Sequence, residues 1–320
     1  MSGPSMSAGS SPAILAIKLG ALGDVLLALG ALADLRAAHR EALAVLTRPA
    51  YRPLLERCPW VDAVIPDPAL PRWRIDGWWR LASRLRGWRF VRVYDLQNSR
   101  RSASYRRFLL PGIPASALPP NTPLPPDGRP ARSLPVPERL AFQLEQAGIA
   151  PRQVLAPSLE WMCAPVDALL ASVGITRPYL VLLPGSSRRH LDKRWPHFQS
   201  LAALLVKRGL KVITIPGPEE SDIGDDWPGV VLRASGRALD LFELAGVLAG
   251  AWAVVGNDSG PTHLAALLGR PGIALFGPAS PEPALTGIDR HRLRVLQSRA
   301  LADLSPQSVL ESLFAQLGAR

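Results

Sequence analysis

Short apolar segments alternate with segments of helical periodicity along this chain, and the alternation starts twice. An apolar run at residues 13–20 leads through a glycine-bearing turn into a helical pattern at residues 25–40, and a second series begins with a strand and loop at residues 179–187. Strands that alternate with helices indicate parallel sheets covered on both faces. The length of 320 residues is sufficient for two cores. We therefore expect an α/β chain of two Rossmann-like, doubly wound domains facing a central cleft, with ligands beyond the carboxyl ends of the strands.

The pattern also sets the expected domain limits. Residues 13–160 form the predicted first domain and residues 161–320 the second, whose terminal helix is a candidate to pack back on the first domain. Residues 1–12 are small and polar and are expected to form a flexible tail without an export signal. Residues 111–137 are dense in proline, and we expect them to form a long surface segment without regular structure.

The composition excludes several classes of protein. Hydrophobic residues make up 48% of the chain, and the apolar runs are interrupted well before the ~20 residues of a membrane span. Cys58 and Cys163 are the only cysteines, too few for a disulfide framework, so a reducing cytoplasm is expected. The net charge of +11 suggests an anionic partner. We do not expect nucleic acid, because aromatic residues do not interleave the basic runs as stacking platforms.

The turn at residues 18–24 follows the first predicted strand. Its glycines permit a tight turn, but their spacing does not match the dinucleotide fingerprint G-x-G-x-x-G. Asp24 lies at the start of the following helix, where it could simply cap the helix. The alternative is a carboxylate that removes a proton from an acceptor hydroxyl. Lys18 and Lys193, two of only four lysines, lie in the stretches with predicted function.

Two loops of the second half have the composition of a diphosphate site. Residues 185–196 combine small residues and two hydroxyls with four cationic side chains, although a solvated basic loop is the alternative. Residues 256–263 join an apolar strand to a helix with proline in its first turn, and a helix N-terminus presents N–H groups to an anion. Glu219 and Glu220 end another strand, where a carboxylate could accept from ribose hydroxyls or be merely solvated.

Three segments together carry a resemblance to a known family. Residues 18–32, 185–196 and 256–281 resemble, in order and spacing, the glycosyltransferase family 9 heptosyltransferases, which build the inner core of lipopolysaccharide. The resemblance implies the GT-B fold, with an acceptor-binding first domain and a second domain that binds the nucleotide-sugar ADP-heptose. It also implies inverting transfer that needs no metal and no cofactor beyond the ADP-sugar donor.

The resemblance assigns roles to individual residues. Asp24 would be the general base, and Lys193 would stabilise the departing diphosphate. The other donor contacts would come from Ser186, Ser187, Glu219, Glu220, Leu239 (at the adenine), Asp258, Ser259, Gly260 and His263. The acceptor side would comprise Lys18, Gly23, Arg72, Arg74, Asp95 and Gln97. The loop between Ser187 and Lys193 is longer than the family's usual loop, and residues 111–137 match no acceptor motif.

The expected partners follow from the same resemblance. They are an ADP-sugar, a lipid A–core oligosaccharide acceptor and the anionic inner face of the cytoplasmic membrane, where the enzyme would be peripheral. The basic-aromatic residues 71–89 are the candidate contact, with the alternative that their tryptophans pack in the first domain's core. Two other functions remain open on this fold: a nucleotide-sugar epimerase and a non-catalytic nucleotide-binding protein.

Overall fold

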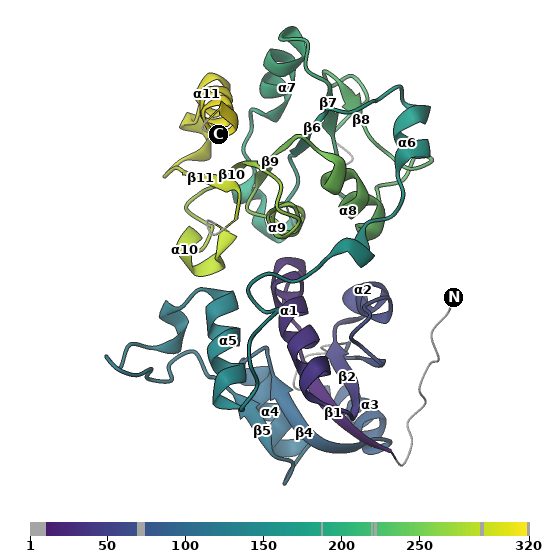
Figure 1. Ribbon diagram of the computed structural model, residues 1–320, viewed down its shortest axis with the longest axis vertical. Coiled ribbons are helices and arrows are strands. Elements are labelled where there is room, and N and C mark those ends of the chain that lie inside the picture. Colours follow the sequence, from purple (N-terminus) through teal and green to yellow (C-terminus); the bar gives the residue numbers. More distant parts are fainter. Residues whose placement is uncertain are drawn as a thin grey trace. The chain divides into compact units, whose positions relative to one another are not determined.

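The chain divides into two compact units, one ending at Ser158 and the other beginning at Leu159 (Figure 1). The computed structural model describes residues 11–68, 74–186, 188–218, 220, 223–288 and 291–318. Three residues with predicted roles, Arg72, Ser187 and Glu219, lie outside this described part, as does most of the predicted tail. Pro12, the last residue of that tail, already belongs to the first strand.

The first unit is a doubly wound, wholly parallel sheet. Its strands are β1 (Pro12–Ile17), β2 (Ala42–Thr47), β3 (Ala63–Pro66), β4 (Arg89–Asp95) and β5 (Ala115–Ala117), in the order β3-β2-β1-β4-β5. Its helices are α1 (Leu22–Ala38), α2 (Arg52–Glu56), α3 (Ile75–Arg86), α4 (Arg100–Phe108) and α5 (Val136–Gln146). The strand order reverses beside β1, so the carboxyl ends of β1 and β4 flank the position where such sheets bind ligands.

The second unit repeats this design with a six-stranded parallel sheet. Its strands are β6 (Leu180–Leu183), β7 (Val212–Thr214), β8 (Val230–Val231), β9 (Ala253–Asn257), β10 (Gly272–Phe276) and β11 (Leu293–Gln297), in the order β11-β10-β9-β6-β7-β8. Its helices are α6 (Asp167–Ser172), α7 (Phe198–Lys207), α8 (Leu241–Gly250), α9 (Gly260–Leu267), α10 (Pro283–Thr286) and α11 (Pro306–Gly318). The reversal falls between β6 and β9, whose carboxyl ends precede the two predicted donor loops.

The terminal helix α11 packs within the second unit. Val309, Leu310 and Leu313 are buried in the core of that unit with Leu201 and Leu205 of α7. In the described part of the chain, no helix combines the length and apolar character needed to cross a membrane.

The proline-rich segment is more ordered than its composition predicted. It contains β5 and a 3-10 turn at Ala131–Ser133, and Leu118, Leu124 and Ala131 form a small buried cluster against Phe142 of α5. The expectation of a structureless loop is therefore wrong. Composition missed this order because the few apolar residues lie far apart in sequence and meet only when the segment folds back on α5.

Candidate active site

The turn after β1 places a buried lysine at the carboxyl edge of the first sheet. Lys18 is 5% exposed, and its Nζ donates to the Leu96 carbonyl at 3.2 Å. Burial lowers the pKa of Lys18, whereas the nearby Asp24 and Asp95 raise it. A cation so held beside two carboxylates offers a fixed positive charge close to any acceptor at this edge.

Asp24 lies in the first turn of α1 with its side chain over Gly20. A Cβ at Gly20 would lie only 2.5 Å from Asp24 Oδ2, so this close approach requires glycine. The N-cap position belongs to Ala21, which makes no side-chain cap bond. Among the described residues, the half-buried Asp24 carboxylate has no hydrogen-bond or ion-pair partner. It therefore is not the side-chain cap that was its alternative role.

The end of β4 brings further predicted residues to the same edge. Asp95 is fully buried, accepts from the Asn98 N–H at 2.8 Å and pairs with Arg106 Nε at 2.9 Å. Its carboxylate therefore fixes the turn that carries Gln97. Gln97 Oε1 in turn accepts from the Leu19 N–H at 2.8 Å, which ties the two turns together.

The remaining residues predicted to meet the acceptor differ in burial and in position. Gly23 is half-buried in the first turn of α1, beside Asp24. Arg74 is exposed just before α3 and pairs with Asp76 at 2.8 Å. Sequence reasoning missed Arg139 of α5, whose pKa is lowered by burial and raised by Asp24. Arg139 stands more than a hundred positions from Asp24, and only the fold shows that the two are close.

In the second unit, a carboxylate at the β9–α9 turn is held between a lysine and a histidine. Asp258 Oδ2 lies 2.6 Å from Lys193 Nζ, and Asp258 Oδ1 lies 3.4 Å from His263 Nε2. Burial acts to raise the pKa of Asp258, but the hydrogen bonds from His263 and Lys193, together with their charges, hold it at about 2. The three predicted residues thus form one cluster, which orients Lys193 and His263.

The start of α9 adds backbone donors to this cluster. Ser259 is the N-cap residue but makes no side-chain cap bond, and its Oγ lies 3.2 Å from Thr262 Oγ1. The first-turn N–H groups of a helix have no partner within the helix, and Gly260 is the first residue of α9. These groups and the positive end of the helix dipole suit a phosphate.

A buried acid lies at the turn after β7. Glu220 is 4% exposed, accepts from the Gly217 N–H at 2.7 Å and pairs with Arg194 Nη2 at 3.3 Å. Arg194 Nε also donates to Ser186 Oγ at 3.2 Å. Glu220 therefore is not the solvated loop residue that was its alternative role. A Cβ at Gly185 would clash with this carboxylate at 2.2 Å, which explains the glycine there.

Two further residues complete this edge. Leu239 is half-buried immediately before Asp240, the N-cap of α8. Asn257, which sequence reasoning missed, accepts from the Trp195 N–H at 3.0 Å and donates to the Pro184 carbonyl at 2.6 Å. The side chain of Asn257 thereby links the β6 and β9 loops. Its position next to Asp258 in the sequence could have identified Asn257 as a candidate site residue.

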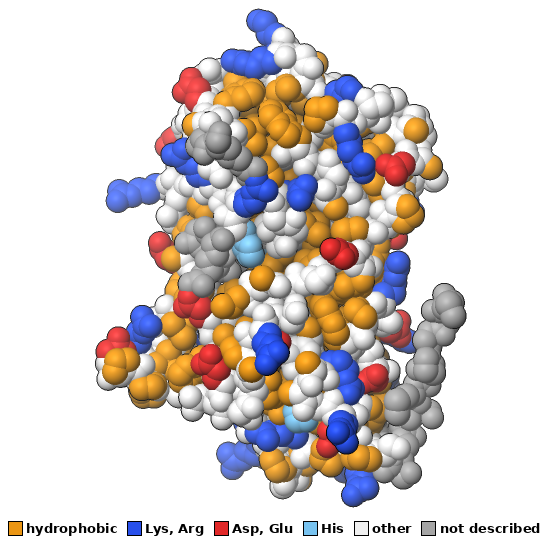
Figure 2. Space-filling view, viewed as in Figure 1, with side chains coloured by type: hydrophobic (Ala, Val, Ile, Leu, Met, Phe, Trp, Pro, Cys, Tyr) orange, Lys and Arg blue, Asp and Glu red, His pale blue; other side chains and the backbone are white. Residues whose placement is uncertain are grey.

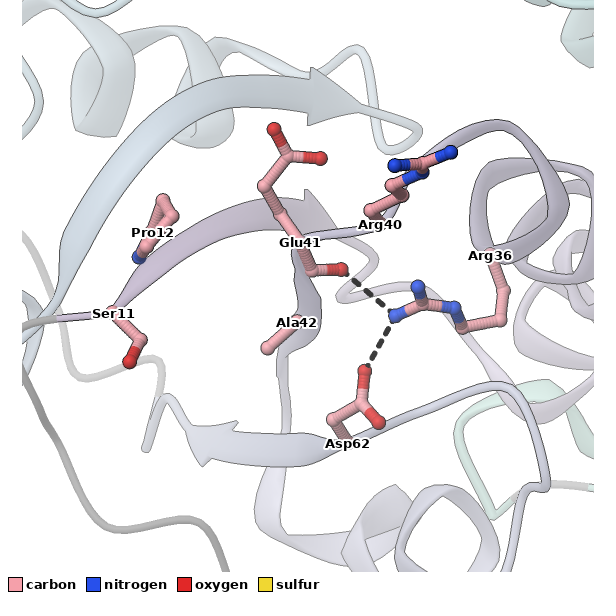
Figure 3. A pocket seen from close by; sticks show the side chains of 7 residues that line it. All are labelled: Ser11, Pro12, Arg36, Arg40, Glu41, Ala42 and Asp62. Carbon is pink, nitrogen blue, oxygen red and sulfur yellow. Dashed lines mark hydrogen bonds and ion pairs between the residues drawn. The ribbon is translucent and has the colours of Figure 1, made fainter.

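An open cavity of about 600 Å³ lies elsewhere in the first unit (Figure 3). It is lined by Ser11, Pro12, Arg36, Arg40, Glu41, Ala42 and Asp62. Arg36 pairs with Asp62 at 2.9 Å and donates to the Glu41 carbonyl at 2.8 Å. The cavity lies at the amino ends of β1 and β2, opposite the edge that carries Lys18, and plays no part in the site. The described residues contain no group of three or more His, Cys, Asp or Glu placed to hold a metal ion.

Comparison with known proteins decides the family. The sequence model of glycosyltransferase family 9 (heptosyltransferase) matches residues 140–311, more than half of the chain. The chain belongs to glycosyltransferase family 9. It is a transferase with the GT-B fold, and the resemblance to this family is confirmed.

Two curated relatives extend the match to the first unit. Lipopolysaccharide heptosyltransferase 2 of Escherichia coli K12 is 28% identical over 95% of this chain and 98% of its own. Lipopolysaccharide heptosyltransferase 1 of Pseudomonas aeruginosa is 30% identical over 84% of this chain and 79% of its own. The solved structure of E. coli ADP-heptose lps heptosyltransferase II superimposes with a TM-score of 0.67 at 26% identity, covering 96% of this chain and 99% of that one.

Proposed function

We propose that this glycosyltransferase moves a heptose from ADP-heptose to an inner-core acceptor of lipopolysaccharide, with inversion at the anomeric carbon. The observation that carries the proposal is the cluster of Lys193, Asp258 and His263 beside the start of α9. The E. coli relatives support it, because one is named for ADP-heptose and both for heptosyl transfer to lipopolysaccharide.

The second unit would bind the donor. Lys193 and the N–H groups at the start of α9 would meet the diphosphate and stabilise the negative charge that develops as ADP leaves. Asp258 holds Lys193 in place, so the ammonium group is fixed before the donor binds. Glu220 would accept from the ribose hydroxyls, and Leu239 would pack against the adenine. We propose no metal or cofactor for this step, because these cationic and backbone groups supply the required positive charge.

The first unit would bind the acceptor and activate it. The Asp24 carboxylate would take the proton of an acceptor hydroxyl as its oxygen attacks the anomeric carbon on the face opposite the diphosphate. Attack from that face forms the new glycosidic bond as the bond to ADP breaks, which inverts the configuration. Lys18, Gln97 and Arg74 would contact the phosphorylated, acidic acceptor, and Arg139 would add positive charge near Asp24.

We also propose that the enzyme works as a peripheral protein on the inner face of the cytoplasmic membrane, without a nucleic-acid partner. The proposed acceptor is a lipid, and the chain carries a net charge of +11. Basic side chains are frequent on the face drawn in Figure 2. Attraction to anionic headgroups follows from such a charge.

The test is the stoichiometry of ADP release. Purified protein is incubated with ADP-heptose, with and without a lipid A–core acceptor, and ADP and the acceptor mass are followed together. We expect one heptose added for each ADP released, and a product anomer opposite to that of the donor by NMR. Nucleotide release without an acceptor would favour the epimerase alternative. Absence of turnover with tight ADP binding would favour a non-catalytic protein.

A further inference from the structure

The helices α3 and α4 cover the same face of the first sheet. Leu81 of α3 and Tyr105 of α4 lie in one buried cluster with Leu15 of β1. The two helices also contact each other, because the rings of Trp78 and Tyr105 meet edge to face with centroids 5.5 Å apart. The outward sides of α3 and α4 therefore belong to one continuous surface of this unit.

Two large aromatic side chains stand on that surface. Trp79 is 62% exposed on α3, and Phe108 is 65% exposed at the end of α4. Each ring lies beneath an arginine, with Arg86 5.9 Å from the Trp79 centroid and Arg107 5.4 Å from the Phe108 centroid. An exposed aromatic ring with a guanidinium over it combines an apolar body with a charged group. This combination suits an interface between an apolar phase, such as a bilayer interior, and water.

The neighbouring tryptophans behave differently. Trp78 packs against Tyr105, and Trp88 stacks on Phe90 with centroids 5.8 Å apart. The alternative that the tryptophans of this segment belong to the core is therefore right for these two residues and wrong for Trp79. Trp73 lies outside the described residues. The structure thus separates one outward tryptophan from two inward ones, which the sequence could not do.

The charge of this surface is strongly one-sided. Residues 74–89 contain five arginines and one aspartate, and residues 100–108 contain four arginines and no acid. The aspartate, Asp76, pairs with Arg74 at 2.8 Å and more loosely with Arg80 at 3.7 Å, and Arg106 pairs with the buried Asp95. The arginines of this surface therefore far outnumber its one partly exposed acid, and Arg80, Arg86, Arg89, Arg100 and Arg107 are all exposed.

We propose that this α3–α4 surface, formed by Trp79, Arg80, Arg86, Arg107 and Phe108, docks on anionic phospholipid headgroups. Trp79 and Phe108 would enter the interface, where aromatic rings are favoured, while the guanidinium groups meet lipid phosphates. The charge complementarity selects an anionic surface. The exposed aromatic rings add affinity for the headgroup level of a bilayer, and nucleic acid, which could stack on the same rings, is the competing occupant that the binding test separates.

The α3–α4 surface runs from one edge of the sheet toward the other. Both α3 and α4 begin at the carboxyl edge, after β3 and β4, the edge that carries Lys18 and Gln97, and Arg86 and Phe108 are the last residues of these helices. The inference rests on the proposed function only for the choice of a bacterial membrane as the anionic surface. Lipid binding can be measured without any transfer reaction, so a failure of the docking proposal can be distinguished from a failure of the proposed function.

The test is sedimentation of the full chain with vesicles of phosphatidylethanolamine and phosphatidylglycerol, compared with phosphatidylcholine vesicles. We expect binding to the anionic vesicles only, lost near molar salt, where the Debye length falls to a few ångströms. In the double variant Arg80→Glu with Arg86→Glu, the partition coefficient should fall at least roughly tenfold. In Trp79→Ala with Phe108→Ala it should fall roughly tenfold through lost apolar burial.

Matched variants in the second unit serve as controls. Arg294→Glu with Arg299→Glu makes the same charge change, and Trp252→Ala with Phe314→Ala removes two aromatics that are 39% and 37% exposed. We expect both controls to bind as the wild type does, and Arg80→Lys with Arg86→Lys to retain most binding.

Further measurements distinguish a loss of lipid binding from misfolding and from a loss of activity. Thermal melts check folding, and turnover on a delipidated, water-soluble acceptor should be unchanged in the α3–α4 variants. Equal losses in the control pairs, or unchanged binding in the α3–α4 variants, would overturn the proposal. Binding to a DNA duplex in preference to the anionic vesicles would overturn it in favour of nucleic acid.

Discussion

The β1–α1 turn and the β9–α9 turn have the same local design and use their aspartates differently. Each turn follows a buried strand, and each places an aspartate near the start of a helix. Asp24 lies over Gly20 with no hydrogen-bond or ion-pair partner among the described residues. Asp258 is held by Lys193 at 2.6 Å and by His263 at 3.4 Å.

The difference indicates what each carboxylate can do. A carboxylate whose pKa is held at about 2, as in Asp258, is a poor proton acceptor near neutral pH and serves to orient Lys193 and His263. The Asp24 carboxylate accepts no hydrogen bond from a described residue, so its lone pairs stay available for a substrate hydroxyl. We therefore expect substitution of Asp24 to affect the reaction rate and substitution of Asp258 to affect stability.

The largest expected effect is on turnover in Asp24→Asn. Removing general-base assistance should lower kcat by ~10²–10⁴-fold, because the amide cannot accept the proton of the acceptor hydroxyl. Steady-state assays with ADP-heptose and acceptor measure this loss. The matched control is Asp127→Asn, an exposed aspartate of the same unit, which should retain wild-type kcat. Near-normal turnover in Asp24→Asn would remove Asp24 from the mechanism.

Lys193→Ala should lower kcat by roughly 10²-fold, because it removes one fixed donor to the leaving diphosphate. It also removes the ammonium group beside the buried Asp258, so that His263 remains as its close neighbour. The exposed Lys207 at the end of α7 provides the control Lys207→Ala, which should change neither kcat nor KM. If the two lysine variants behave alike, Lys193 belongs to a solvated loop and not to the donor site.

The contacts of Asp258 with Lys193 and His263 predict that the stability of the fold depends on pH. Its pKa is lowered in the folded state, so the carboxylate stabilises the fold above its unfolded pKa, and the stabilisation is lost as pH falls toward about 2. The contribution is about 2 kcal/mol, from about 1.4 kcal/mol for each pKa unit. Urea unfolding of wild type and Asp258→Asn at several pH values measures it. The difference in unfolding free energy between wild type and Asp258→Asn should have its full size at neutral pH and become smaller below pH ~4. A difference that does not change with pH would contradict the lowered pKa of Asp258.

The smallest expected effect concerns two of the N-cap residues of the second unit. Asp240 caps α8 with a complete capping box, whereas Ser259 makes no side-chain cap bond at α9. Asp240→Ala should therefore cost ~1 kcal/mol of unfolding free energy, and Ser259→Ala only a few tenths. Ser259→Ala should still weaken ADP binding, because we assign its hydroxyl to the diphosphate. Equal stability costs for the two variants would mean that Ser259 acts as a structural cap.

The sequence predicted the parts of this molecule that local patterns encode. Alternating apolar and helical segments indicated two doubly wound sheets, and the composition of residues 256–263 indicated a strand–turn–helix site. It did not predict contacts between residues distant in sequence. Arg139 approaches Asp24 only because α5 packs on α1, and Arg194 reaches Glu220 only through the arrangement of two loops.

Composition was also a poor guide where a few residues decide the outcome. The small cluster of Leu118, Leu124 and Ala131 orders a proline-rich segment that was expected to be irregular. Similarly, the sequence showed several tryptophans at residues 71–89 but not which of them face inward. Helical phase and the packing of α3 on α4 settle that question, and neither can be obtained from residue counts.

The central claim is that the β1–α1 turn supplies the base and that the second unit binds the donor. Its most direct test is calorimetric titration of ADP into wild type, Asp24→Asn and Lys193→Ala, with kcat measured on the same samples. We predict that Asp24→Asn binds ADP as tightly as the wild type while its turnover collapses, because its carboxylate acts on the acceptor. We predict that Lys193→Ala loses both ADP affinity and turnover, because its ammonium group meets the diphosphate. Loss of ADP affinity in Asp24→Asn, or unchanged affinity in Lys193→Ala, would contradict the assignment of base and donor site to the two units.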